Sequence, residues 1–154
     1  MNAEFIKPFI ASFINVLLTM AQTELKPGEA LEKVDSKACG DVSGLIGMIG
    51  DDIKGSLSIT FEESLALDIM NKMLGEKPTS VDDDVQDMVG EVVNMVCGGA
   101  KSTLAETSQE FGMATPIVVF GKNHTINHQV DGAKLVMPFT SEAGKAYLEI
   151  CFNK

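Results

Sequence analysis

The chain has 154 residues, of which 45% are hydrophobic, so its length allows one domain with a substantial core but not two comfortable ones. We therefore predict a single domain over residues 1–154. A formal net charge of −10 and a pI near 4.5 argue against binding to nucleic acid or an anionic membrane, because both need clustered lysine and arginine. The three cysteines, Cys39, Cys97 and Cys151, form no CxxC pair, so we expect reduced core thiols in a cytoplasmic protein.

Residues 1–22 are apolar enough to suggest either a signal peptide or a core helix. Glu4 precedes Lys7, the only early cation, and Ser12 and Asn15 interrupt the apolar run. These features fit a signal peptide poorly, and the run is too short to span a bilayer. The apolar residues instead recur at helical spacing, at Phe5, Phe9, Phe13, Val16, Leu17 and Met20. We predict a core helix over residues 3–22, regular beyond Pro8.

Residues 30–61 change to short segments rich in apolar and β-branched residues, separated by glycine turns. Segments 30–39, 42–49 and 53–61 are predicted to be strands, and their tight turns predict an antiparallel meander. A short helix should follow over residues 62–74, because Glu62 and Glu63 stand at its start and Gly75 at its end.

The segment from residue 80 to residue 108 carries the strongest helical pattern. Its apolar residues fall three and four apart, which predicts one buried stripe: Val85, Met88, Val89, Val92, Val93, Val96, Cys97, Ala100 and Leu104. On the opposite face Asp87, Glu91, Asn94 and Gly98 lie within about 60° of one another. Asn and Gly disfavour helices, and Gly98 would leave the surface flat for another molecule. The competing interpretation is a solvated face with glycines that serve helix packing.

Four strands are predicted after this helix, over residues 116–120, 124–130, 135–140 and 146–152. Pro138 restricts its strand to an edge or a bulge. The order of helix, strands and helix, followed by helix and strands, makes the two halves look like diverged copies. The first helix of each half carries an asparagine, Asn15 or Asn94. Only Asn94 has a glutamate three residues before it, since Ser12 occupies that place in the first half.

Asp87, Glu91 and Asn94, with three and two residues between them and twenty-one residues before Pro116, resemble the signature of the CheC/CheX/FliY family of bacterial chemotaxis phosphatases. The similarity extends over nearly the whole chain, including the opening FIKPFIASFINVL. CheC-like members carry the motif on both helices and CheX-like members only on the second, so with Ser12 the chain resembles the CheX-like members. The resemblance implies an α/β (α+β) sandwich with a pseudo-twofold axis and two long helices packed on a largely antiparallel sheet.

The resemblance also implies an activity on the aspartyl phosphate of a CheY-like response regulator. Asn94 would hold the attacking water in line with the P–O bond, and Glu91 would pair with a lysine of the partner. Asp87 and Gly98 would have supporting roles on the same face. The partner's acidic pocket and Mg²⁺ already activate the phosphoryl group, so the chain needs no metal or cofactor of its own. The resemblance further implies a homodimer that forms through sheet edges.

Other chemical motifs are weaker. The GGAKST segment of residues 98–103 resembles the end of a P-loop, but Met95 and Ala100 hold its glycine positions and no strand precedes it. His124 and His128 are four residues apart, as in helical zinc sites, yet no glutamate follows His124 and the segment favours a β-hairpin. Surface or hairpin histidines are the expectation there, with adventitious metal binding as the alternative.

Two functions from different classes therefore stay open. One is a phosphatase that resets a response regulator. The other is a non-catalytic CheC-like module that only binds a chemotaxis or signalling partner. The retained pair of Glu91 and Asn94 favours the phosphatase, and a phosphate-release assay separates the two.

Overall fold

The computed structural model describes residues 3–51, 53–107, 110–128 and 130–153, and within them it contains three helices and eight strands. The helices are α1 (Ala3–Ala21), α2 (Glu63–Leu74) and α3 (Asp83–Ala105). The strands are β1 (Lys26–Pro27), β2 (Leu31–Lys33), β3 (Val42–Ile49), β4 (Lys54–Phe61), β5 (Gly112–Met113), β6 (Ile117–Phe120), β7 (Ala133–Thr140) and β8 (Lys145–Asn153).

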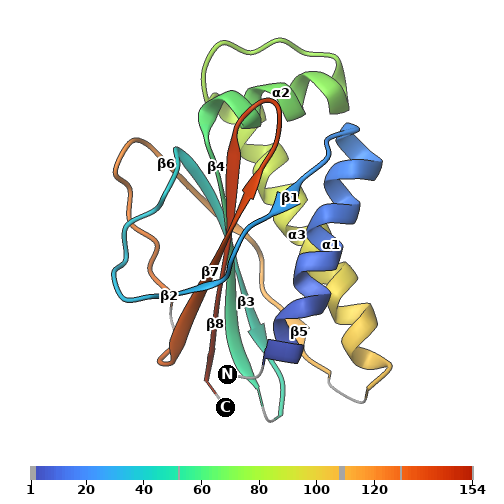
Figure 1. Ribbon diagram of the computed structural model, residues 1–154, viewed down its shortest axis with the longest axis vertical. Helices are drawn as coiled ribbons and strands as arrows, with labels where there is room; N and C mark the ends of the chain where they lie inside the picture. Colours follow the sequence, from blue (N-terminus) through green and yellow to red (C-terminus); the bar gives the residue numbers. More distant parts are fainter. Residues whose placement is uncertain (1–2, 52, 108–109, 129, 154) are drawn as a thin grey trace.

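The strands form one antiparallel sheet in the order β1-β7-β8-β4-β3-β5, with β2 also paired to β7 and β6 also paired to β3. The α1 and α3 helices lie side by side against one face of this sheet, and α2 crosses one end (Figure 1). The strand order is symmetric: β1, β7 and β8 follow one another from one edge as their counterparts in the other half, β5, β3 and β4, do from the other edge. The predicted α/β (α+β) sandwich with a pseudo-twofold relation and two long helices on one face is therefore confirmed.

The core lies between the sheet and the two long helices. Phe13 of α1 packs edge-on against Phe61 of β4 and Phe139 of β7, with ring centroids 6.0 and 5.0 Å apart. All nine apolar residues of the predicted α3 stripe are buried. Since each fully buried large apolar side chain stabilises the fold by about 1.5–3 kcal/mol, this stripe holds α3 firmly on the sheet.

The ends of the helices have local causes. Asp82 caps α3, because its Oδ1 accepts a hydrogen bond of 2.9 Å from the Val85 N–H. The helix ends at Ala105, before the predicted limit at residue 108, because the N–H groups of Glu106 and Thr107 turn back to the carbonyls of Thr103 and Leu104. In α1, Pro8 lies inside the helix, whereas the sequence predicted a regular helix only beyond it.

The predicted meander over residues 30–61 is wrong in its first strand. Of residues 30–39 only Leu31–Lys33 forms a strand, and it pairs with β7 of the second half instead of with β3. Beyond it Asp35 forms a turn, accepting a hydrogen bond of 3.1 Å from the Lys37 N–H. Cys39, predicted to be a core thiol, is exposed. The β3–β4 hairpin is as predicted. The short strands β1 and β2 pair with β7, and the short strands β5 and β6 pair with β3, so each half lends its first strands to the hairpin of the other half.

The strand predicted over residues 124–130 is absent from the described part of that segment, where Thr125 makes an isolated bridge to Lys37. Residue 129 lies outside the described residues. Both histidines of the segment are buried against the sheet, so the expectation of surface or hairpin histidines is also wrong. The segment stays irregular because His124 and His128 bond to Ser43 and Ser56 of the sheet below it.

Pro138 does not place β7 at the edge of the sheet, because β8 pairs with one side of β7 and β1 and β2 pair with the other. The pairing of β7 with β8 continues through Pro138, but the pairing of β7 with β1 and β2 is interrupted opposite this proline. Residues 28–30 span the gap between Pro27 and Leu31, whereas only Met137 and Pro138 separate their partners Phe139 and Val136. The extra residue is a bulge in the neighbouring segment, so the bulge, and not the edge, accommodates Pro138.

Candidate functional site

The outward face of α3 carries the predicted site residues. Asp87 and Glu91 are exposed, and Asn94 is half-buried on the same face. Within the described part of the chain, neither Glu91 nor Asn94 has a side-chain hydrogen bond or ion pair. Gly98 continues the row, and a Cβ placed on it would meet no atom within 4 Å. The face therefore offers a carboxylate and an amide one turn apart, beside open space at Gly98.

The neighbouring helix α1 lacks such a pair. Asn15 is exposed, and its Oδ1 accepts a weak hydrogen bond of 3.4 Å from Thr19 Oγ1. Ser12 stands where a glutamate would be needed. Leu18 and Met20, which are 53% and 43% exposed, lie towards the end of α1. The surface formed by α1 and α3 thus carries polar groups on α3 and a partly apolar end on α1.

The chemistry that α3 offers is orientation of a reacting group. A carboxamide has donors and an acceptor but is not a base at neutral pH. Cys97 cannot serve as a nucleophile, because burial raises the pKa of its thiol to about 12, against a smaller lowering effect of the Lys101 charge. Among the described residues, no group of three or more His, Cys, Asp or Glu side chains could hold a metal ion.

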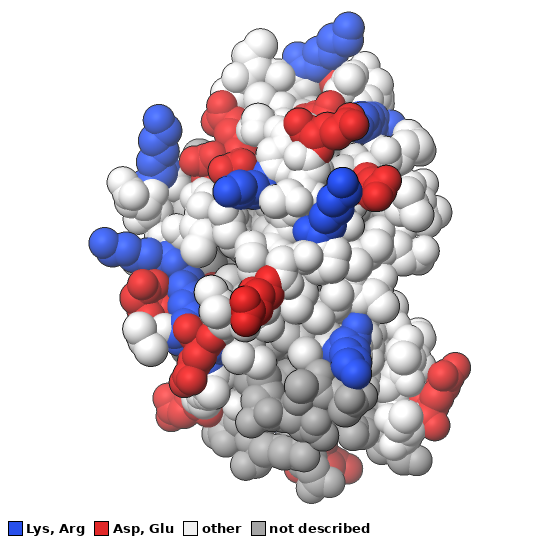
Figure 2. All heavy atoms as spheres, viewed as in Figure 1, with Lys and Arg blue, Asp and Glu red and all other residues white. Residues whose placement is uncertain are grey.

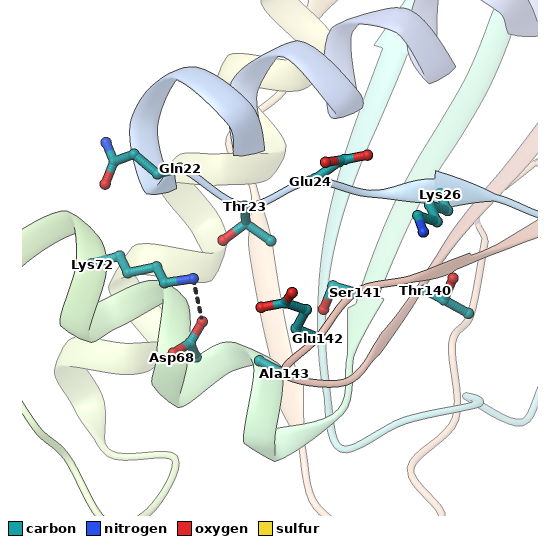
Figure 3. Close-up of a pocket in the computed structure, with 10 residues that line it drawn as sticks. All are labelled: Gln22, Thr23, Glu24, Lys26, Asp68, Lys72, Thr140, Ser141, Glu142 and Ala143. Carbon is teal, nitrogen blue, oxygen red and sulfur yellow. Dashed lines mark ion pairs between the residues drawn. The ribbon is translucent and has the colours of Figure 1, made fainter.

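A polar hollow of about 420 Å³ lies between the end of α1, α2 and the β7–β8 turn (Figure 3). Inside it Lys72 Nζ lies 3.0 Å from Asp68 Oδ2, an ion pair that lacks hydrogen-bond geometry. None of the predicted site residues lines it. Its lining residues are Gln22, Thr23, Glu24, Lys26, Asp68, Lys72, Thr140, Ser141, Glu142 and Ala143.

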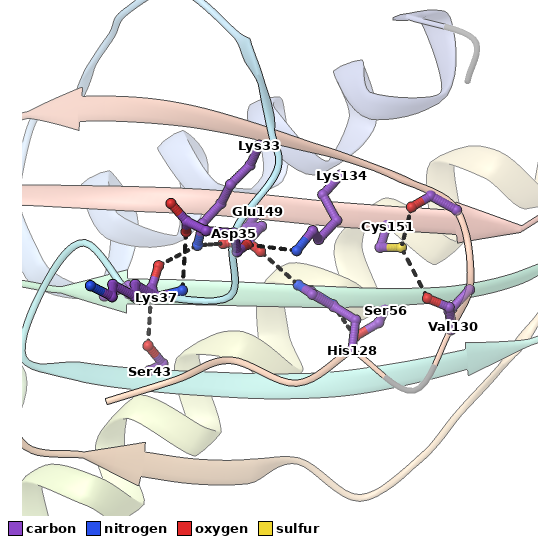
Figure 4. Close-up of polar contacts among 12 residues, drawn as sticks. Lys33, Asp35, Lys37, Ser43, Ser56, His128, Val130, Lys134, Glu149 and Cys151 are labelled. Atoms are coloured by element: carbon purple, nitrogen blue, oxygen red, sulfur yellow. Dashed lines mark hydrogen bonds and ion pairs between the residues drawn. The ribbon is translucent and has the colours of Figure 1, made fainter. Parts of the chain in front are cut away.

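A buried ionic network on the face of the sheet away from α1 and α3 was missed by the sequence analysis (Figure 4). Glu149 of β8 accepts from Lys33 Nζ at 2.8 Å and from His128 Nε2 at 2.9 Å, and the other ring nitrogen of His128 lies 2.7 Å from Ser56 Oγ. Burial alone would raise the pKa of the Glu149 carboxyl, but these hydrogen bonds and the charge of Lys33 lower it below its ordinary value. A glutamate in the middle of an otherwise apolar strand was the available signal.

Among the described residues that Figure 2 colours, acidic and basic side chains are interspersed and form no basic patch. Among the described residues, no helix combines the length and the apolar composition that a membrane span requires.

Residues 42–140 match the family model described as chemotaxis phosphatase CheX. No curated protein is a significant match to the sequence. Among solved structures, the chain is 64% identical to a CheC-like superfamily protein from Shewanella sp. PV-4, with a TM-score of 0.94 and 100% of both chains covered. It is 58% identical to the chemotaxis protein CheX from Vibrio vulnificus, with a TM-score of 0.92 over 98% of this chain and 100% of that chain.

A more distant structure shares the fold. It is a chain of the CheX–CheY–BeF₃–Mg²⁺ complex from Borrelia burgdorferi, which is 24% identical, with a TM-score of 0.83 over 99% of this chain and 100% of that chain. The family model covers more than half of the chain, and the relatives from Shewanella and Vibrio match over nearly its full length. The chain belongs to the CheX family of chemotaxis phosphatases.

Proposed function

We propose that the protein accelerates hydrolysis of the aspartyl phosphate of a CheY-like response regulator, with Asn94 and Glu91 as the working pair. The observation that supports this most is that both side chains lie one turn apart on the exposed face of a helix whose other face is buried. Neither side chain has a hydrogen-bond or ion-pair partner in the described part of the chain. The family is that of the chemotaxis phosphatases, and a relative with this fold occurs in a complex with CheY.

The partner supplies most of the chemistry in this proposal. The acidic pocket of a response regulator holds Mg²⁺ and the phosphoryl group, so catalysis needs mainly positioning of the attacking water. Asn94 enters that pocket and binds the water through its amide, so that the water attacks in line with the bond that breaks. Glu91 pairs with a lysine beside the phosphorylated aspartate, while Asp87 and Gly98 shape the docking surface. The test is release of phosphate from a phosphorylated CheY-type regulator with and without the protein.

Replacing Glu91 with alanine should weaken docking and lower the rate together. A hydrogen bond to a charged group contributes about 1.5–3 kcal/mol, so kcat/KM should fall about 10- to 100-fold, with a rise in KM. Steady-state kinetics of phosphate release measure both values. The exposed Glu106 just beyond α3 provides a matched control, since Glu106→Ala should leave KM and kcat unchanged. A Glu91→Ala variant with the parent's kinetics would remove Glu91 from the proposal.

The homodimer that the family resemblance implies is part of the proposal, and we place its interface at the β6 edge. Ile117 and Phe120 at the two ends of this edge strand are 64% and 52% exposed. Exposed apolar edges favour pairing with another chain. The opposite edge is less suited, because β1 and β2 are short, contain Pro27 and are separated by a bulge.

Introducing a charge at β6 should therefore give a monomer. For Phe120→Lys we expect the mass measured by light scattering to fall from about twice the chain mass of 16.5 kDa to that mass. Leu31→Lys, at a residue of the opposite edge that is 57% exposed, should leave the mass of the parent unchanged. A parent that is already monomeric would contradict this interface.

A non-catalytic binding module remains the second candidate function, supported by the exposed apolar side chains of Leu18 and Met20 towards the end of α1. It predicts that the protein binds a partner but leaves the rate of phosphate loss unchanged.

A cytoplasmic location, where response regulators act, belongs to the same proposal as the phosphatase.

A further inference from the structure

The two long helices meet in a close contact between Ser12 of α1 and α3. The Ser12 hydroxyl donates a hydrogen bond of 2.8 Å to the Val96 carbonyl oxygen. Gly99 lies against the same serine, and a Cβ placed on it would clash with Ser12 Oγ and lie 3.3 Å from Ser12 Cβ. Because only a residue without a side chain fits opposite the hydroxyl, Ser12 and Gly99 together set the separation of α1 and α3.

Ser12 has the place in α1 that Glu91 has in α3, three residues before an asparagine. Their environments nevertheless differ, since Glu91 is exposed and Ser12 is half-buried against the neighbouring helix. A glutamate at residue 12 would press a longer, charged side chain against the Val96 carbonyl and the Gly99 backbone. Asn15 is therefore left on α1 without a carboxylate beside it.

We propose that Ser12 is a positioning residue: its contact with Val96 and Gly99 fixes how far Asn94 projects from the helix pair. This inference rests on the proposed phosphatase function. Val96 is two residues beyond Asn94 on the same helix, so a displacement of the helices at this contact also shifts the Asn94 amide. A shift of about 1 Å in a group that aligns a reactant can cost about 100-fold in rate.

A double-mutant cycle of Ser12→Ala and Gly99→Ala tests this inference, with kcat and KM for a phosphorylated CheY-type regulator as readouts. Gly99→Ala should lower kcat about tenfold or more and change KM by less than about threefold, because the new methyl group pushes against the Ser12 hydroxyl. Ser12→Ala removes that hydroxyl. The remaining approach of 3.3 Å between two Cβ atoms needs a movement of only a few tenths of an ångström. The double variant should therefore recover the kcat of Ser12→Ala alone.

Two further variants sharpen the result. Gly90→Ala is the matched control on the same helix, because its new Cβ would lie 3.4 Å from Val118, an ordinary contact, and kcat should stay at the parent's value. Ser12→Glu places a glutamate three residues before Asn15, and the close contact at residue 12 predicts a lower kcat and no second active site. A rise in activity with Ser12→Glu would overturn the inference.

The outcomes separate the inference from the proposed function. A parent without phosphatase activity would overturn both. Two results with an active parent would overturn only the positioning role. One is a Gly99→Ala variant that keeps the parent's kcat. The other is a double variant whose unfolding temperature recovers but whose kcat does not. If Gly99→Ala does not fold, Ser12→Ala alone decides, because loss of its hydrogen bond should lower kcat several-fold without a change in KM.

Discussion

Replacing Asn94 with alanine is expected to abolish most of the acceleration of phosphate loss from the response regulator. The amide is the only proposed contact to the attacking water, and removal of one such preorganised polar group lowers kcat by about 100- to 1,000-fold in other enzymes. Asn94 makes no side-chain hydrogen bond within the described residues, so its loss should leave the unfolding temperature nearly unchanged. Single-turnover release of phosphate from a phosphorylated CheY-type regulator measures the effect, and calorimetry confirms the fold.

Asn15 provides the matched control for Asn94. It is also an asparagine on the surface of a long helix, but no carboxylate precedes it by three residues. Asn15→Ala should therefore retain the rate of the parent. Equal rates for Asn94→Ala and the parent would rule out the proposed role of the amide. Equal losses in the two variants would instead place the reaction on both helices.

The features that the sequence predicted best are those set by local periodicity. The apolar stripe from Val85 to Leu104 has one solution, because a helix that buries it must turn Asp87 and Glu91 outwards. The β3–β4 hairpin and the end of α2 at Gly75, which has φ 71°, likewise follow from patterns within a few residues. The candidate site lies on such an element, so its exposure follows from the same periodicity.

The features that the sequence did not predict are set by long-range pairing. Nothing within residues 30–39 indicates that β2 will pair with β7, which lies about one hundred residues further on, and proximity in the chain favoured β3 instead. The histidines show the same limit. His124 and His128 alternate with polar residues, as in a surface hairpin. In the structure each side chain is buried against the sheet and is hydrogen-bonded to a serine that sequence spacing does not identify.

The buried network around Glu149 should be the most sensitive point for stability. Glu149→Gln removes the only carboxylate that lies against Lys33 Nζ in the described structure, and the Lys33 and Glu149 side chains are only 7% and 3% exposed. Breaking a buried ion pair by removing one partner costs about 3–5 kcal/mol, which for a domain of this size lowers Tm by roughly 6–20 °C. Adding Lys33→Met, which removes the unpaired ammonium group, should recover most of the loss. Thermal unfolding of the three proteins at pH 7 measures these differences.

The pH dependence of the stability lost in Glu149→Gln shows whether the loss comes from the charge of the Glu149 carboxylate. Because the pKa of Glu149 in the folded protein lies below its ordinary value of 4.5, the carboxylate contributes stability that is fully present above about pH 4.5. That contribution is lost as the pH falls through the lower pKa of the folded state. The gap in unfolding free energy between the parent and Glu149→Gln should therefore be nearly constant from about pH 5 to pH 8 and should narrow below about pH 4.5. A gap that persists unchanged in acid would show that Glu149 acts through packing, because protonation of the parent's carboxyl group would then have removed nothing.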